Sequence, residues 1–250
     1  MSATREPTRL LGGRVLLDQR EAGLRATIDP VLLAAFVPAR PGEAVLEAGA
    51  GVGTASLCLL ARVSGARAVA VERDAAQAAA AEANAALNGW SMRLGVIAGD
   101  IAARGTAHAA AALGPFAHAM ANPPWFSEGS LPDAPPRRAA KHAEAAATLG
   151  PWVSFLARRV EQGGTVTLAL TPAHLPDALA ALAAARLGSA TLLPLWPRAG
   201  LPAKRLLLAG RKGGRGACRI LPGLVLHRAD GAFTDEAEAV LRHAGTLPPT

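Results

Sequence analysis

Residues 44–53 read Ala44-Val45-Leu46-Glu47-Ala48-Gly49-Ala50-Gly51-Val52-Gly53. The apolar start predicts a short buried strand over 44–46, and residues 54–63 predict a helix. The three glycines between them allow the backbone to approach a ligand closely, where the first N–H groups of the helix point outward. We therefore expect a strand, a ligand-binding turn and a helix, which is the opening unit of an α/β fold.

The glycine spacing and the acidic residue restrict the ligand of this turn. The pattern is G-x-G-x-G, whereas dinucleotide-binding turns follow G-x-G-x-x-G and would have glycine where Thr54 stands. The Lys-Ser or Lys-Thr pair of nucleotide-hydrolysing loops is also absent from the turn. Glu47 suits a cationic ligand. S-adenosylmethionine carries an amino group and a sulfonium, so it fits this turn.

Strand-like and helix-like segments alternate downstream, which predicts a mostly parallel sheet with helices on both faces. The predicted strands cover residues 67–71, 93–98, 116–120 and 165–170, and the predicted helices cover 74–87, 101–112, 144–160 and 175–187. Two more strands, 190–195 and 204–209, joined by the turn-like residues 196–200, predict an antiparallel hairpin at the sheet edge. Together with 44–46 these make a seven-stranded sheet. Residues 224–227 and 234–243 predict a last strand and a last helix.

The chain divides into two predicted parts. Residues 1–40 predict an N-terminal leader, with a hairpin-like piece near Gly12 and a helix from Asp29, packed on a catalytic domain of residues 41–250.

The N-terminus lacks the apolar stretch of a signal peptide, and no run of about 20 apolar residues occurs. The two cysteines lie far apart and the histidines show no ligand spacing, so we predict neither a disulfide nor a metal site. These features favour a cytoplasmic protein.

A net charge of +7 favours a polyanionic partner such as nucleic acid. Basic residues without any acid occupy residues 198–219, namely Arg198, Lys204, Arg205, Arg211, Lys212, Arg215 and Arg219. They predict either a surface that holds RNA phosphates or simply a solvated basic hairpin. Whether the protein is a monomer or a homodimer is left open by the sequence, although an exposed edge beside the hairpin would allow two subunits to pair.

Acidic residues end the second and third strands of the series. Glu72 is placed to accept both ribose hydroxyls of a nucleoside, and Asp100 is a plausible acceptor for an adenine amino group. Carboxylates at strand ends also cap helices, so Asp74 and Asp100 have that alternative reading. Their order, each at the end of a successive strand, favours a nucleoside site.

Asn122-Pro123-Pro124-Trp125 follows the predicted strand 116–120. Consecutive prolines hold the backbone extended, so the Asn122 side-chain oxygen and the Pro123 carbonyl can both accept hydrogen bonds from one planar amino group. Trp125 offers a face on which a flat ring can stack. The alternative is an ordinary turn, since Asn-Pro often begins one.

With these residues placed, the chain resembles class I S-adenosylmethionine-dependent methyltransferases, and among them the bacterial tRNA adenine-N6 methyltransferases that modify a valine tRNA beside the anticodon. The resemblance implies a Rossmann-like class I methyltransferase fold. It also implies that Glu47, Gly49, Gly51 and Gly53 hold the methionine part of the cofactor, Glu72 the ribose and Asp100 the adenine. Asn122, Pro123, Pro124 and Trp125 would hold the target base, with Trp125 standing where the family usually has Tyr or Phe.

Three functions follow as hypotheses. The first is methyl transfer to the N6 amino group of an adenine in structured RNA, through basic residues such as Arg198, Lys204, Arg205, Arg211 and Lys212. The second is methylation of a protein glutamine amide, because those enzymes share the Asn-Pro-Pro motif; the leader of about 40 residues is short for their recruiting domain. The third is a catalytically silent cofactor-binding or RNA-binding protein on the same fold.

Overall fold

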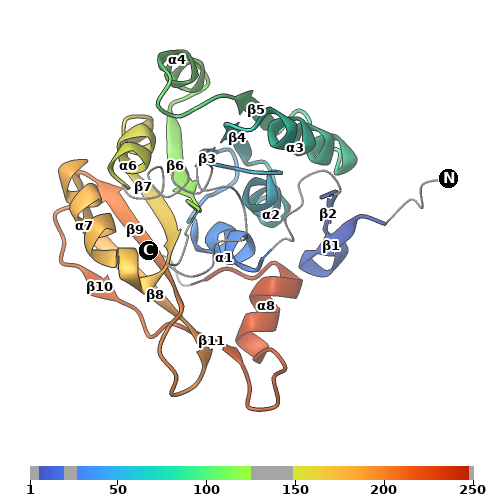
Figure 1. Ribbon diagram of the computed structural model, residues 1–250, viewed down its shortest axis with the longest axis vertical. Coiled ribbons are helices and arrows are strands. Elements are labelled where there is room, and N and C mark those ends of the chain that lie inside the picture. Colours follow the sequence, from blue (N-terminus) through green and yellow to red (C-terminus); the bar gives the residue numbers. More distant parts are fainter. Residues whose placement is uncertain (1–5, 20–26, 125–148, 248–250) are drawn as a thin grey trace, which may run out of the picture.

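The structure is a computed structural model that describes residues 6–19, 27–124 and 149–247. A twisted sheet lies at the centre with helices on both of its faces (Figure 1). Its strands are β3 (Ala44–Ala48), β4 (Arg67–Glu72), β5 (Leu94–Ala98), β6 (Phe116–Ala121), β7 (Val160–Leu170), β8 (Leu187–Arg198), β9 (Arg205–Lys212), β10 (Arg219–Ile220) and β11 (Leu224–His227).

The strand order reverses at one point of the sheet. Within the described residues the main path runs β5-β4-β3-β6-β7-β9-β8, and only β9 is antiparallel to its neighbours on that path. The chain leaves β3 toward β4 and β5 and then returns to place β6 on the other side of β3. The strand order therefore reverses between β3 and β6, and a ligand is expected beyond their carboxyl ends.

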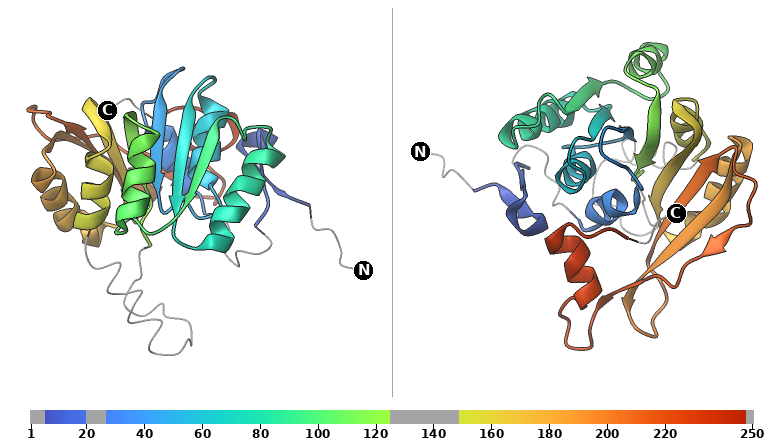
Figure 2. Two further views of the ribbon diagram at one scale, coloured as in Figure 1. Left: turned by 90° about the horizontal axis from the view of Figure 1, so that it is seen from above. Right: turned by 180° about the vertical axis from the view of Figure 1, so that it is seen from behind.

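Helices pack against both faces of the sheet, as the two views of Figure 2 show. One face is packed by α1 (Asp29–Phe36), α2 (Thr54–Arg62) and α8 (Asp235–His243), with α3 (Ala75–Leu87) at the β4 and β5 end. The other face is packed by α4 (Arg104–Ala112), α6 (Gly150–Ala157) and α7 (Leu175–Ala184), the last following the short helix η2 (Pro172–His174). Each face has its own apolar cluster, so burial on both sides fixes the strands in register.

The predicted α/β fold with a mostly parallel sheet and an antiparallel hairpin is confirmed, but the sheet continues past that hairpin. In the described part of the chain β10 and β11 both pair with β8 in parallel, for example Leu224 with Leu195. The sheet thus has nine strands where seven were predicted. The expectation of an exposed strand edge beside the hairpin is wrong, because β10 and β11 pair with the outer side of β8. Gly223 allows the close crossing, because a Cβ there would lie 2.5 Å from the Pro194 carbonyl oxygen.

Several predicted boundaries shift at the helix-to-strand junctions. The helix predicted to reach Val160 ends at Ala157, and Val160 already begins β7; its predicted start at residues 144–148 lies outside the described residues. The helix predicted over 175–187 likewise ends at Ala184. Apolar residues continue across both junctions, so hydrophobic periodicity gives no stop signal there. Trp196 lies inside β8 and not in a turn, and its Nε1 donates to the Pro222 carbonyl at 3.2 Å.

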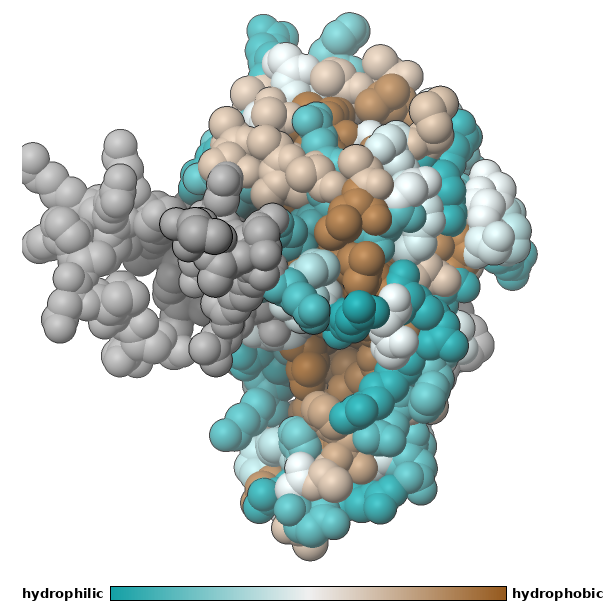
Figure 3. All heavy atoms as spheres, turned by 90° about the vertical axis from the view of Figure 1, so that its right-hand side faces the viewer, coloured by the Kyte–Doolittle hydropathy of each residue, from teal (hydrophilic) through white to brown (hydrophobic). Residues whose placement is uncertain are grey.

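The N-terminal segment is hydrogen-bonded to Asn84 of α3 and to Asn88, the C-cap residue of that helix. It forms a small hairpin of β1 (Thr8–Leu10) and β2 (Val15–Leu17) around the short helix η1 (Leu11–Gly13). Asn84 exchanges hydrogen bonds with the backbone of Asp18, and Asn88 with the backbone of Leu16. On the face that carries this hairpin, α3 and α8, apolar residues reach the surface only as a broken band between polar ones (Figure 3).

None of the helices within the described residues is long and apolar enough to cross a membrane. Cys58 is buried in α2 and Cys218 is exposed, and both are free thiols.

Candidate active site

The predicted site residues meet at the carboxyl edge of the sheet. Ala48 at the end of β3 is paired with Val71 of β4 on one side and with Ala121 of β6 on the other. The glycine turn after β3, Glu72 at the end of β4 and Asn122 after β6 therefore leave neighbouring strands at the same level. Asp100 follows β5, one strand further out, where Glu72 pairs with Ala98.

The turn after β3 depends on backbone conformations that favour glycine. Gly49, Gly51 and Gly53 have φ of +67°, +57° and +84°, in the left-handed region. The N–H groups of Gly49 and Ala50 both donate to the Val71 carbonyl, at 2.8 and 3.1 Å. The turn is thereby folded over the end of β4, and the helix α2 begins directly after it.

Space around the turn is also limited by neighbouring side chains. A Cβ at Gly49 would lie 2.7 Å from two ring carbons of Trp152, and one at Gly53 would lie 3.3 Å from the Ala81 Cβ. Trp152 belongs to α6 and is half-buried, so its indole lies against the turn while packing on the core beneath. The sequence alone gave no signal of this contact between Trp152 and Gly49.

Glu47 is buried at 3% exposure, and its carboxylate faces the start of α2. Its Oε2 accepts hydrogen bonds from the Ser56 N–H at 2.9 Å and from the Ser56 hydroxyl at 2.5 Å. Burial raises the pKa of Glu47 from 4.5 to about 7, although the hydrogen bonds from Ser56 oppose that rise. Its other oxygen, Oε1, accepts no hydrogen bond from the described residues, so one acceptor remains for a ligand group.

Glu72 links the end of β4 to the glycine turn. Its Oε2 accepts from the Gly51 N–H at 2.8 Å, and its Oε1 accepts from the Asp74 N–H at 2.8 Å. A carboxylate has about four lone-pair positions, so Glu72 retains acceptor capacity for two hydroxyls. Asp74 itself accepts from the N–H groups of Ala76 and Gln77, which confirms its reading as the N-cap of α3.

Asp100 lies half-buried in the turn between β5 and α4. Its Oδ1 accepts from the Ala102 N–H at 2.8 Å, and its carbonyl accepts from the Ala103 N–H at 2.9 Å. The side chain therefore shapes the local turn and does not cap α4, whose N-cap is Ala103 without a side-chain cap bond, so the helix-cap alternative for Asp100 is wrong. Within the described residues Oδ2 has no hydrogen-bond partner, so a cofactor amino group can still be accepted there.

Asn122 is half-buried directly after β6, followed by the buried Pro123 and the exposed Pro124. Among the described residues none forms a hydrogen bond with the Asn122 side chain, so none of them competes with a ligand for its amide oxygen. Trp125, the predicted stacking residue, lies outside the described residues.

An ion pair joins the start of α1 to the start of β9 at this edge. The Arg205 Nε donates to the Asp29 Oδ2 at 3.0 Å, across 176 positions of sequence. This contact was missed by sequence reasoning, which read Asp29 only as the start of its own helix; the structure shows no side-chain cap bond there. Ser56, Asn84 and Trp152 were missed as well, because nothing in their local sequence marks a long-range partner.

The basic residues of 198–219 do not form one surface. Because β9 runs antiparallel to β7, it starts with Arg205 at the carboxyl edge, where Leu206 pairs with Leu170. Arg211 pairs with Thr165, about 20 Å from Arg205 along the strand. Arg198 and Lys204 are exposed near the carboxyl edge. At the other end the Lys212 ammonium donates to the carbonyls of Ala157 and Val160 at 2.8 and 2.7 Å.

Strand order, the antiparallel β9 and the glycine turn after β3 define a class I methyltransferase fold. Solved structures share it. A predicted O-methyltransferase from Agrobacterium tumefaciens is 25% identical with a TM-score of 0.72, over 88% of this chain and 98% of that one. A precorrin-6y C5,15-methyltransferase from Geobacter metallireducens has a TM-score of 0.51 at 11% identity, over 78% and 93%.

Curated relatives carry a more particular name. A tRNA1(Val) (adenine(37)-N6)-methyltransferase of Shewanella sp. strain MR-4 is 33% identical over 134 residues, which are 54% of each chain. The enzyme of that name from Dickeya chrysanthemi is 26% identical over 88% of this chain and 87% of its own length. The first of these alignments thus spans about half the length of the relative it matches. No family model matches the chain.

Proposed function

We propose that the protein transfers a methyl group from S-adenosylmethionine to the N6 amino group of an adenine in RNA, and that the RNA is a tRNA modified near its anticodon. The placement of Asn122 carries the proposal. Ala48 and Ala121 are paired residues of adjacent strands, so the Asn122-Pro123-Pro124 segment and the glycine turn begin side by side. The tRNA methyltransferases named above support the choice of substrate.

The described residues fit the cofactor. Three glycines with positive φ leave positions 49, 51 and 53 of the turn without side chains, and Glu47 Oε1 is an acceptor without a described partner. We propose that Glu47 and the turn hold the methionine part, Glu72 the ribose and Asp100 the adenine. The cofactor supplies an electrophilic methyl group on a positively charged sulfur.

The protein would act on the target base by accepting hydrogen bonds. An adenine amino nitrogen is conjugated with its ring and is a poor nucleophile. If the Asn122 oxygen and the Pro123 carbonyl each accept one of its N–H groups, electron density on nitrogen rises and tetrahedral geometry is favoured. The acceleration would come from positioning the reactants and from dipoles fixed in advance.

RNA would approach along the carboxyl edge. Arg198 and Lys204 are exposed near this edge and are free to track phosphates, whereas Arg205 is held by Asp29. The target base must be unpaired or turned out of its stack to reach Asn122. We place the protein in the cytoplasm, where its free thiols would remain reduced.

The test is transfer of labelled methyl from S-adenosylmethionine to tRNA lacking its modifications, followed by nucleoside analysis. We expect N6-methyladenosine, and a loss of about a hundredfold or more in turnover for Asn122→Ala with cofactor affinity retained. Full activity of Asn122→Ala would contradict the mechanism. Transfer to a protein glutamine in place of tRNA would contradict the substrate while leaving the acceptor chemistry intact.

A further inference from the structure

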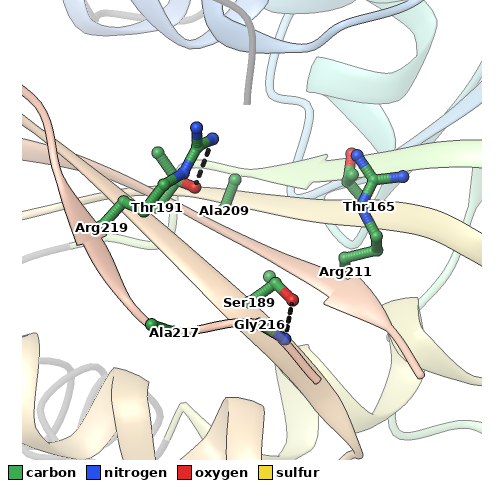
Figure 4. A pocket seen from close by; sticks show the side chains of 9 residues that line it. Thr165, Ser189, Thr191, Ala209, Arg211, Gly216, Ala217 and Arg219 are labelled. Atoms are coloured by element: carbon green, nitrogen blue, oxygen red, sulfur yellow. Dashed lines mark hydrogen bonds between the residues drawn. The ribbon is translucent and has the colours of Figure 1, made fainter. Parts of the chain in front are cut away.

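A cavity of about 330 Å³ lies on the sheet away from the glycine turn (Figure 4). It opens over the middle of β7, β9 and β8, and the segment leading into β10 forms one wall. Its polar groups come from Thr165, Ser189, Thr191, Arg211, Gly216 and Arg219. None of them belongs to the site proposed for methyl transfer.

Two arginines flank this cavity from opposite sides, Arg219 beside Thr191 and Arg211 beside Thr165 (Figure 4). The Arg219 Nη2 donates to the Thr191 hydroxyl at 3.3 Å, and the Arg211 Nη1 donates to the Gly163 carbonyl at 2.8 Å. A guanidinium has five N–H donors, so most of the donors of both arginines remain available. The lining contains no carboxylate.

The hydroxyls of the cavity add donors of their own. The Ser189 oxygen accepts from the Gly216 N–H at 2.8 Å, and the Thr191 oxygen accepts from Arg219, so both hydroxyl protons remain for an acceptor. Thr165 differs, because its hydroxyl pairs with the His118 Nδ1 at 2.8 Å. The nearby Glu43 carboxylate is already engaged, by the His118 Nε2 at 3.2 Å and by the Arg40 N–H at 2.8 Å.

The cavity therefore presents cationic and hydroxyl donors and requires a ligand rich in acceptor oxygens. Paired guanidinium groups with hydroxyl donors match the oxygens of a phosphate, which accept several charge-assisted hydrogen bonds at once. A volume of about 330 Å³ also leaves room for a group attached to that phosphate. We propose that this cavity is a phosphate-binding site, either for a small phosphorylated compound or for a backbone phosphate of a bound nucleic acid.

Binding of ribose 5-phosphate and of inorganic phosphate to the full chain tests the site, by calorimetry at constant ionic strength. We expect saturable binding that Arg219→Ala weakens about tenfold and Thr191→Val severalfold. Arg215→Ala is the matched control, because Arg215 is exposed in the same segment and carries the same charge but does not line the cavity. It is expected to change affinity less than twofold. Circular dichroism of each variant verifies the fold.

Equal weakening by Arg219→Ala and Arg215→Ala would overturn the proposal, because general electrostatic attraction would then explain binding. Absence of saturable binding to the unaltered chain would overturn it as well.

Binding of unmodified tRNA identifies the source of the phosphate. A tRNA affinity lowered by Arg219→Ala and not by Arg215→Ala assigns the site to the RNA backbone. Equal tRNA affinities, with ribose 5-phosphate binding lost only in Arg219→Ala, assign it to a free phosphorylated compound. The site stands whether or not methyl transfer is observed.

Discussion

The Glu72 carboxylate accepts a hydrogen bond from the backbone N–H of Gly51 at 2.8 Å, which ties the end of β4 to the turn after β3. The residue proposed to hold the ribose thus also positions the loop proposed to hold the methionine part. A substitution at Glu72 is therefore expected to alter the conformation of the glycine turn as well as the proposed ribose contact.

Glu72→Ala removes the acceptor for the Gly51 and Asp74 N–H groups together with the proposed ribose contact. We expect the dissociation constant of S-adenosylmethionine to rise at least about tenfold, because hydrogen bonds to a charged group are lost. Calorimetric titration measures it. Glu82→Ala, an exposed carboxylate on α3, is the matched control and is expected to bind normally. Unchanged affinity in Glu72→Ala would refute its role in cofactor binding.

Glu47 predicts a pH dependence of stability. Its pKa is raised from 4.5 to about 7 in the folded protein, so between these values the folded state holds a proton that the unfolded state has released. Stability therefore falls as the pH rises from 4.5 to 7 and is then constant, with a total cost on the order of 3 kcal/mol. Glu47→Gln removes this decline. Urea unfolding of both proteins from pH 5 to 8 measures it, and parallel curves would show that Glu47 is ionised throughout.

Gly49→Ala is expected to lower both stability and cofactor affinity for two reasons. The φ of +67° costs a residue with a Cβ about 1–2 kcal/mol, and the new Cβ meets the Trp152 ring at 2.7 Å. Adding Trp152→Leu removes the collision and leaves the backbone cost. We therefore expect the double variant to recover part of the loss of Gly49→Ala in urea unfolding. No recovery would mean that the ring does not limit this position.

Asn84→Ala is expected to destabilise the protein by about 2–4 kcal/mol. The Asn84 side chain is fully buried, and its Nδ2 donates to the carbonyls of Asp18 and Val52, both at 3.1 Å. Without this side chain both carbonyls lose their donor, and the link that Asn84 makes between the N-terminal segment and the glycine turn is lost. Urea unfolding gives the magnitude. Gln77→Ala on the same helix, which lacks these contacts, is the control, and an equal loss there would mean that the buried hydrogen bonds of Asn84 are not the cause.

RNA binding is expected to depend on the exposed cations of the carboxyl edge. Arg198→Ala and Lys204→Ala should each weaken tRNA binding and reduce the slope of log affinity against log salt by about 1, as for a lost phosphate contact. Lys212→Ala should leave that slope unchanged, because its ammonium is bonded to the Ala157 and Val160 carbonyls. Filter binding at several salt concentrations distinguishes them. A reduced slope for Lys212→Ala would contradict this separation of the basic residues.

The order of elements followed from the sequence because each predicted strand is a short apolar run bounded by glycine or polar residues. The glycine turn, Glu72 and Asn122 could be placed at one edge for the same reason, since each follows a strand of the parallel series. Element ends were less certain where apolar residues continue from a helix into a strand, as at Ala157 to Val160.

Contacts between distant segments could not be predicted. Asp29 and Arg205 are 176 positions apart, and Glu47 depends on Ser56 for a partner that no motif specifies. The cluster of basic residues over 198–219 looked continuous in sequence, but β9 carries Arg205 and Arg211 toward opposite ends of its neighbouring strand β7. Local patterns determine which residues share a strand, whereas tertiary packing determines which charges remain available.

The pairing of β10 and β11 with β8 also bears on how the protein behaves when concentrated. A twelve-residue strand with a bare outer edge would be a template for adding strands from other molecules. Arg219–Ile220 and Leu224–His227 occupy that edge instead, and the exposed Arg219 adds a charge that disfavours stacking. By pairing with β8, these two strands are therefore expected to disfavour aggregation through this edge of the sheet.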